Sequence, residues 1–389
     1  MPNGHKLRFG KMLARTGITF AMAVAAASPS LATRFAVKHL ASDGSVAAPT
    51  VDADLINPWG IAASPTGPFW VANNGSGTST LYNTNGSKLG LTVAIPAPGN
   101  PTGIVFNGSA GQFKVTDGTK TGSSAFIFAT EGGTIDGWTP SVSTAQAFQG
   151  FDGSSLGLGA VYKGLAIGLS GGSPFLYATD FRNGMIDQLD GNFNLVRAFT
   201  EPSVKPGYAP FGAQVLNNQL FVTYALQDGD KEDDVAGAGN GYVDIFNLDG
   251  SFVRQLVGQG GEINSPWGLA IAPSNFGSFA GDLLVGNFGD GTISGFDLTT
   301  GMFDGRLLGA DGNPLVLGDL WALVGGNGGA GGDKDKIYFT AGVADEAHGL
   351  FGSIAPIPEP GTWGLMLLGF PAIGMALRRS RAARRLGTA

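Results

Sequence analysis

A short phrase, centred on a glycine that usually follows an aromatic or polar residue, recurs along most of the chain. Its clearest copies are Asn57–Ala62 and Ser265–Ala270, which share the run Pro-Trp-Gly. The central residues of the six copies, called markers here, are Gly60, Gly103, Gly164, Gly212, Gly268 and Ala322. The markers are spaced by a little over 52 residues on average. Such a period indicates a repeat architecture in which each unit is one supersecondary element that stacks on its neighbours.

Each marker is followed by further short apolar runs of strand length. Second runs include Phe69–Ala72, Ala125–Phe128, Phe175–Ala178, Leu220–Val222 and Ile337–Phe339, bounded by Gly, Asn, Asp or Pro. Third runs open with glycine at Gly133–Asp136, Gly184–Asp187, Gly241–Asp244 and Gly291–Ser294. No segment of the body sustains a helical apolar period over three turns. The chain is therefore predicted to be all-β.

Six units of three or four short strands predict a six-bladed β-propeller. Each blade has two apolar faces that it can cover only by stacking in a closed ring. A strand near Phe35–Val37 is expected to pair with the last unit and close that ring. A β-sandwich or a β-helix is the alternative, since short strands alone do not distinguish these folds.

The chain has no cysteine among its 389 residues. Disulfides, thiolate chemistry, Cys-ligated zinc and iron–sulfur clusters are therefore excluded. Stability has to come from packing and backbone pairing.

The N-terminus has the three parts of a secretory signal peptide. Lys6, Arg8, Lys11 and Arg15 precede an apolar stretch from Ile18 to Ala27. Ser30-Leu31-Ala32 then offers the small-x-small pattern of a cleavage site. We expect residues 1–32 to be a signal helix that is removed after Ala32.

The C-terminus is organised in a similar way. Pro358-Glu359-Pro360 precedes uncharged residues from Gly361 to Leu377, at the lower limit for spanning a bilayer as a helix. The chain then ends in a basic cluster of Arg378, Arg379, Arg381, Arg384 and Arg385. These arginines would hold the end of the segment on the cytoplasmic side. A permanent single-span anchor is the alternative to a processed signal.

Motif, short hydrophobic segment and arginine tail, in this order at the C-terminus, resemble the PEP-CTERM sorting signal of exopolysaccharide-producing bacteria. The resemblance implies recognition and cleavage by an exosortase-type membrane protease. It also implies a location in the cell envelope or outside the cell, with a transient or permanent anchor in the inner membrane. The chain is thus divided into a signal peptide (1–32), a propeller domain (33–355) and a sorting signal (356–389).

The body resembles a family of uncharacterised bacterial propeller proteins with a distant likeness to NHL-type repeats. The segments that carry the resemblance are Asn57–Ala62, Asp233–Phe246 and Leu320–Ile354. This family has no assigned activity.

Removing residues 1–32 and the segment after Pro360 makes the chain strongly acidic. The body between them keeps 14 basic and 30 acidic side chains, a net charge of −16. Such a surface repels phosphate backbones, so nucleic acid is excluded as a partner.

One connection between a second and a third strand is much longer than the rest. It contains five carboxylates in the seven residues from Asp228 to Asp234. The alternating Asp228, Asp230 and Glu232 offer oxygen ligands suited to Ca²⁺. The spacing departs from an EF-hand loop, since neither its glycine nor its final bidentate glutamate is present. A solvated acidic loop is the alternative.

Polar residues also recur after the second strands. Asn73, Glu131, Asp180 and Asn287 could converge at the mouth of the ring and hold a metal ion. That arrangement would resemble the oxygen-rich metal site of propeller lactonases. The alternative is that they are turn residues that bond to their own backbone.

Other catalytic groups are scarce, because the body contains only His39 and His348 and no Gly-x-Ser-x-Gly elbow. We therefore expect an exported binding or structural module, with exopolysaccharide or other envelope components as partners. A metal-dependent propeller hydrolase, such as a lactonase, is the alternative.

Overall fold

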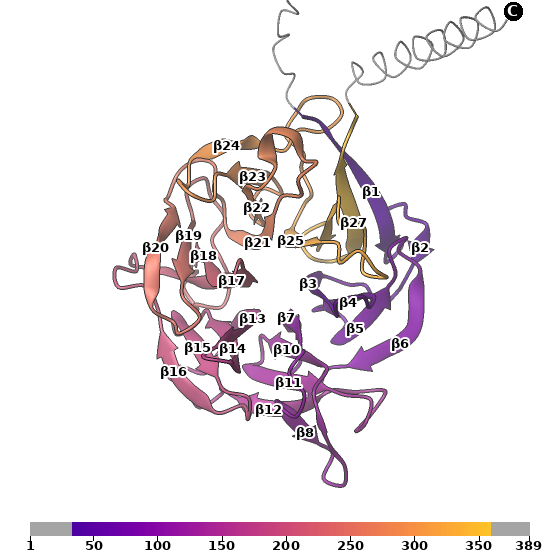
Figure 1. The fold of residues 1–389 in the computed structure, drawn as a ribbon, viewed down its shortest axis with the longest axis vertical. Helices are drawn as coiled ribbons and strands as arrows, with labels where there is room; N and C mark the ends of the chain where they lie inside the picture. The colour runs from indigo at the N-terminus through magenta and orange to yellow at the C-terminus, as the bar shows by residue number, and fades with distance from the viewer. Residues whose placement is uncertain (1–32, 359–389) are drawn as a thin grey trace, which may run out of the picture. The chain divides into compact units, whose positions relative to one another are not determined.

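A computed structural model describes residues 33–358, which form six small sheets of mainly antiparallel strands around one central axis (Figure 1). Five sheets have four strands and the sixth has five. In each sheet the first strand contacts the first strands of the neighbouring sheets around the axis. The predicted six-bladed β-propeller is therefore confirmed.

In blades 1 to 5 the strands follow one another outward from the axis in chain order, whereas the outer edge of blade 6 is formed by the first two strands of the described chain. Blade 1 consists of β3 (Pro58–Ala63), β4 (Phe69–Asn73), β5 (Thr78–Tyr82) and β6 (Lys88–Ala94). Blade 2 consists of β7 (Pro101–Phe106), β10 (Phe126–Thr130), β11 (Thr134–Trp138) and β12 (Phe148–Asp152), with a side hairpin of β8 (Lys114–Thr116) and β9 (Thr121–Ser123). Blade 3 consists of β13 (Tyr162–Ser170), β14 (Ser173–Asp180), β15 (Met185–Leu189) and β16 (Leu195–Phe199).

Blades 4 and 5 repeat this order, and blade 6 has two strands from the start of the described chain at its outer edge. Blade 4 consists of β17 (Tyr208–Leu216), β18 (Gln219–Leu226), β19 (Tyr242–Phe246) and β20 (Phe252–Val257). Blade 5 consists of β21 (Pro266–Ile271), β22 (Leu283–Asn287), β23 (Ile293–Phe296) and β24 (Phe303–Arg306), with a 3₁₀ turn η1 (Gly277–Phe279). Blade 6 consists of β25 (Leu320–Gly325), β26 (Ile337–Ala341), β27 (Leu350–Pro356), β1 (Phe35–Ser42) and β2 (Thr50–Val51).

The ring is closed by strands from the two ends of the described chain. In blade 6, β1 pairs antiparallel with β27, so that Phe35 lies opposite Pro356 and Ser42 lies opposite Leu350. The closing role expected for the strand near Phe35 is confirmed. Because the last blade contains the first strand, the ring cannot open without breaking this ladder.

All six markers lie in the innermost strands, where neighbouring blades come closest. A Cβ on Gly60 would lie 2.7 Å from the carbonyl oxygen of Thr102 in the next blade, and one on Gly164 would lie 2.8 Å from that of Phe211. A Cβ on Gly212 would collide with the carbonyl oxygen of Trp267. Glycine is therefore required here because backbone packs directly against backbone.

The two ends of the described chain lie on the same face of the ring. We call the face at which the innermost strands begin the mouth face. Since β27 begins there and runs for seven residues, Pro356 lies on the opposite face. Phe35, its partner in the ladder, lies there as well. Both ends of the described chain thus leave the ring from the face opposite the mouth.

The predicted processing signals lie almost wholly outside the described residues. Pro358 is the last residue described, whereas Ala32, Glu359, Pro360, Arg378 and Arg379 fall beyond it on either side. Among residues 33–358, no helix has the length and apolar character needed to cross a membrane.

Three third strands carry a buried carboxyl at equivalent positions. These residues are Asp136, Asp187 and Asp244, all at most 2% exposed. Burial raises the pKa of Asp136 to about 7 and that of Asp187 to about 6. At Asp244, burial and the nearby charge of Glu201 raise the pKa to about 8. The folded ring therefore retains protons that the unfolded chain releases near pH 4.

These carboxyls predict that the free energy of unfolding falls as the pH rises from about 4 to about 8. Across this window the folded state holds more protons than the unfolded state, so raising the pH favours unfolding. Thermal melts should give a lower Tm at about pH 8 than at about pH 5. Asp244→Asn should flatten this decline, whereas Asn in place of the exposed Asp249, whose pKa is lowered by Ser251, should leave it unchanged. A Tm that rises over the same range would contradict the prediction.

The marker glycines predict a second effect on stability. Gly212→Ala should lower the free energy of unfolding by about 3 kcal/mol, because the methyl group forces β17 away from β21. Gly90→Ala is the matched control, since an added Cβ at this position in β6 has nothing within 4 Å. Urea unfolding measures both variants. Equal effects of the two substitutions would show that the approach at the axis is not the constraint.

Candidate functional site

A cavity of about 450 Å³ opens at the mouth face of the ring. It combines aromatic side chains with four carboxylates and one lysine. The lining residues are Trp59, Glu131, Lys163, Phe211, Asp233, Asp234, Phe288, Trp321 and Glu346. They come from all blades, through the starts of innermost strands and the loops that follow second strands. The volume lies within the usual range for small-molecule sites.

The floor of this cavity is built from residues that directly precede the markers. Trp59 and Trp321 are stacked with their ring centroids 3.4 Å apart. Trp267 meets both edge-on, at 6.1 and 5.8 Å. Phe288, after β22, stacks on Trp321 at 4.2 Å. Because the innermost strands approach so closely, these side chains meet at the axis and form an aromatic plug.

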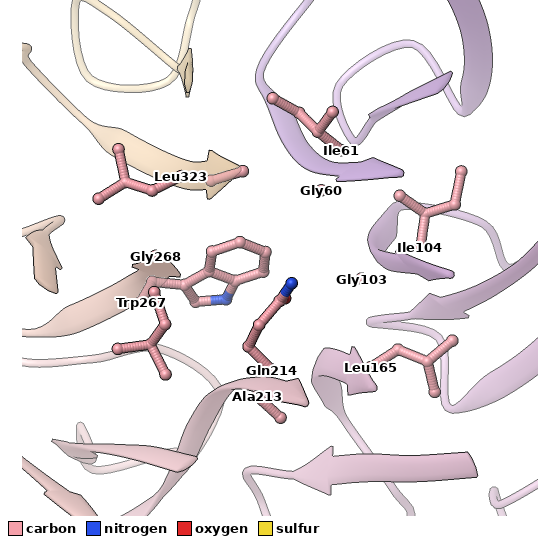
Figure 2. A pocket seen from close by; sticks show the side chains of 12 residues that line it. Gly60, Ile61, Gly103, Ile104, Leu165, Ala213, Gln214, Trp267, Gly268 and Leu323 are labelled. Atoms are coloured by element: carbon pink, nitrogen blue, oxygen red, sulfur yellow. The ribbon is translucent and has the colours of Figure 1, made fainter. Parts of the chain in front are cut away.

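Below the plug the axial channel is narrow. Figure 2 shows Trp267 and Gln214 pointing into it, surrounded by aliphatic side chains such as Ile104 and Leu165. The space left is about 20 Å³, enough for roughly one water molecule. The channel therefore provides no passage for a larger ligand, and the polar groups are concentrated at the mouth.

Lys163 is the buried charge of the site. Its side chain is only 2% exposed, and its Nζ donates hydrogen bonds to Glu131 at 2.5 Å and to Asp233 at 2.8 Å. It also lies 5.3 Å from the ring centroid of Trp59. Burial alone would lower the pKa of Lys163, but the charges of Glu131 and Asp233 outweigh it, and the pKa is raised. Lys163 is thus a permanent cation held by acidic residues.

Two further carboxyls of the cavity hold protons more tightly than usual. Burial raises the pKa of Glu346 to about 7, and the charges of Glu131 and Asp233 add to this effect. Burial also raises the pKa of Asp234 to about 6. Asn57 positions Glu346 by donating from Nδ2 to its Oε2 at 2.6 Å, while the Trp321 indole donates to Asn57 Oδ1 at 3.0 Å. Glu346 can therefore either donate or accept a hydrogen bond near neutral pH.

Of the four residues predicted to converge at the mouth, only Glu131 lines the cavity. Asn73 donates to Thr78 and Thr80 within blade 1. Asp180 accepts hydrogen bonds from Val161 and from Asn183 in the adjoining turn. Asn287 donates to Thr292, and its Oδ1 accepts the backbone N–H of Asn264. These three side chains form hydrogen bonds in or beside their own turns, and the Oδ1 atom of Asn73 is buried without a partner among the described residues.

The long acidic loop reaches the cavity, but through other residues than those expected to bind calcium. Asp233 and Asp234 line the cavity. Asp228 accepts the backbone N–H of Glu232, and Glu232 forms an ion pair with Arg182. Asp230 is exposed on the surface.

Within residues 33–358, no three or more histidine, aspartate or glutamate side chains are grouped so that they could hold a metal ion. The calcium and mouth-metal sites stay predictions from the sequence.

Lys163, Glu346 and the aromatic floor were not identified from the sequence. A signal for Lys163 exists in the residues that precede the markers. These are Trp59, Thr102, Lys163, Phe211, Trp267 and Trp321, of which only Lys163 is charged. No comparable signal marks Glu346, because its approach to the axis depends on how the loop 342–349 folds.

The chain matches no protein-family model, but it has clear relatives. It is 35% identical over 333 residues to an uncharacterised protein of Acanthamoeba polyphaga mimivirus, covering 83% of this chain and 80% of that protein. A second uncharacterised mimivirus protein is 33% identical over 330 residues, with 82% and 85% covered. The chain belongs to the family of these mimivirus proteins.

Among solved structures, the chain is similar to the PQQ-bound aldose sugar dehydrogenase of Streptomyces coelicolor. The TM-score is 0.50 at 15% identity, covering 84% of this chain and 99% of that one. Virginiamycin B lyase from Staphylococcus aureus gives a TM-score of 0.45 at 13% identity, covering 83% and 100%. At this identity the likeness to the dehydrogenase shows the propeller fold alone.

The ion pairs of Lys163 predict an unequal response to loss of charge. Glu131→Gln should lower the free energy of unfolding by about 2 kcal/mol, because it leaves a buried cation with a single, largely exposed partner. Glu232→Gln is the matched control, since its pair with Arg182 is exposed and should contribute less than about 1 kcal/mol. Chemical denaturation measures both. Equal losses of stability in the two variants would contradict the conclusion that the buried Lys163 needs its ion-pair partners.

Proposed function

We propose that the protein is an exported β-propeller that acts as a binding module in the cell envelope or extracellular matrix, with the mouth cavity as its ligand site. The observation that carries this proposal is the cavity itself. It combines an aromatic floor, a buried cation and acidic groups beyond those paired with that cation. The two histidines of residues 33–358 lie elsewhere, with His348 bonded to Asp43 and His39 beside the Ala47 carbonyl. The cavity thus has donors and acceptors for binding, and we assign it no nucleophile.

The C-terminal signal gives the module its place in the cell. We propose that an exosortase-type membrane protease recognises the segment around Pro358, Glu359 and Pro360, and that the following hydrophobic segment anchors the protein in the inner membrane before processing. Exopolysaccharide or other envelope components are the partners that suit this location.

The geometry of the ring supports this arrangement. Pro356 and Phe35 lie on the face opposite the mouth, at the two ends to which the predicted signals are attached. While the tail is anchored, the mouth cavity would therefore face away from the membrane. A ligand in the periplasm or matrix could reach it without passing between the protein and the bilayer.

A ligand screen tests the binding role. Thermal shift with a library of sugars, amines and carboxylates should identify compounds that raise the Tm by mass action. Phe288→Ala should weaken any such ligand about tenfold or more, because Phe288 lines the cavity. The matched control is Phe303→Ala, in the outer strand β24 and away from the mouth. Hits that respond equally to both variants, or a screen without hits, would count against the cavity as a ligand site.

Mass spectrometry of the native protein tests the processing separately. We expect mature ends near Thr33 and near Pro360. A protein that retains both ends would contradict export with C-terminal processing while leaving the ligand site unaffected.

A further inference from the structure

We propose that the mouth cavity binds one ring of a neutral or amino sugar, held by unpaired buried hydrogen-bonding groups above the aromatic floor. The inference rests on the proposed binding function and specifies its ligand class. It is carried by three features of the cavity: two buried polar atoms without partners, a floor of aromatic rings, and an excess of negative charge.

The first unpaired atom is the indole nitrogen of Trp59. Of the three indoles in the plug, Trp267 donates to the Lys163 carbonyl at 2.9 Å and Trp321 donates to Asn57. The Trp59 Nε1 has no partner among the described residues, although Trp59 is only 2% exposed and lines the cavity. Leaving such a buried donor without an acceptor costs free energy. A bound group that accepts a hydrogen bond would recover this cost.

The second unpaired atom is a carboxylate oxygen of Asp234. Its Oδ2 is buried and lacks a hydrogen bond of good geometry within residues 33–358. Burial raises the pKa of Asp234, and the nearby Ser265 hydroxyl, which is itself without a well-aligned partner, opposes this only in part. Asp234 lines the same cavity as Trp59. The site therefore needs an acceptor at one point and a donor at another.

A hydroxyl group meets both needs, because it donates one hydrogen bond and accepts others. An ammonium or guanidinium ion has no acceptor for the Trp59 N–H, and a carboxylate has no donor for Asp234. Lys163 uses two of its three N–H bonds on Glu131 and Asp233, which leaves a third donor. Glu346 adds a group that donates or accepts. This mixture suits a ligand with several hydroxyls on a rigid frame.

The aromatic floor suits the apolar side of a sugar ring. The C–H bonds of a pyranose carry a weak positive charge, which the negative faces of aromatic rings attract. Trp59, Trp321, Phe211 and Phe288 supply these rings without competing for the hydroxyls. A flexible polyol would bury less apolar surface and lose more conformational entropy on binding.

The charge of the cavity restricts which sugars fit. Four carboxyls line it against the single charge of Lys163, which is already paired. A uronic acid would bring a further negative charge toward these groups and be repelled. A neutral sugar avoids this repulsion, and an amino sugar gains from the excess negative charge.

The test uses the full-length protein and isothermal titration with glucose, galactose, mannose, glucosamine and glucuronate, together with choline and acetate as non-sugar probes. We expect at least one neutral or amino sugar to bind, and glucuronate to bind at least about tenfold more weakly. Trp59→Phe, which keeps a ring but removes the N–H, should weaken the bound sugar about tenfold. Asp234→Asn should weaken it to a similar extent and serves as a second variant if the first one fails to fold.

The matched control is Trp138→Phe. Trp138 in β11 is also buried and also has an unpaired Nε1, but it packs on Trp70 between blades and does not line the cavity. Its substitution should leave sugar binding unchanged. Equal losses in the two tryptophan variants, or glucuronate binding as tightly as glucose, would overturn the proposal. Choline or acetate binding in a Phe288-dependent manner without any sugar would overturn the ligand class and leave the binding role standing. A panel without any binder would overturn the ligand class, and the broader thermal-shift screen would then decide the binding role.

Discussion

The close approach of six backbone strands around the axis is the constraint on which the rest of this structure depends. Five of the six contact positions are glycine, and a Cβ added at any of these five would collide with the backbone of the next blade. Threonine hydroxyls add hydrogen bonds across these junctions, from Thr102 to the Tyr162 carbonyl at 2.8 Å and from Thr179 to that of Phe211 at 2.7 Å. The ring is thus stabilised by backbone contacts at the axis and by the pairing of β1 with β27 in blade 6.

This approach also decides where chemistry can take place. Since the innermost strands leave so little room, the residues before the markers meet at the axis, and the aromatic plug closes the channel. The cavity above the plug can then collect loops from every blade, whereas the space beneath it admits roughly one water molecule. Packing of the backbone therefore separates the mouth cavity from a second space of about 260 Å³ farther along the channel, which is lined by residues of β3, β7, β13, β17 and β25.

Lys163 shows how the electrostatics follow from the same geometry. It stands where the other blades carry Trp, Phe or Thr, so a charge is buried in a position made for uncharged side chains. A buried cation requires partners, and Glu131 and the long acidic loop provide them. The loop is therefore more than a solvated surface feature. Its carboxylates and Glu346 together make the mouth acidic despite the lysine.

The number of blades, the order of their strands and the closing role of the strand near Phe35 could be predicted from the sequence. These features depend on spacing and on glycine, both of which are visible along the chain without knowledge of distant contacts. The processing signals at residues 1–32 and beyond Pro358 remain predictions.

The site itself could be predicted only in part. The acidic loop was correctly identified as an unusual insertion, but Asp233 and Asp234 face the axis instead of Asp228, Asp230 and Glu232. Asn73, Asp180 and Asn287 looked equally suited to a shared site, yet each forms hydrogen bonds in its own turn or the one beside it. The sequence by itself determined the ring, because a repeated local pattern leaves stacking as the way to cover its apolar faces. Only the tertiary structure decided which side chains share the cavity, because that depends on where each loop folds relative to an axis that no single segment defines.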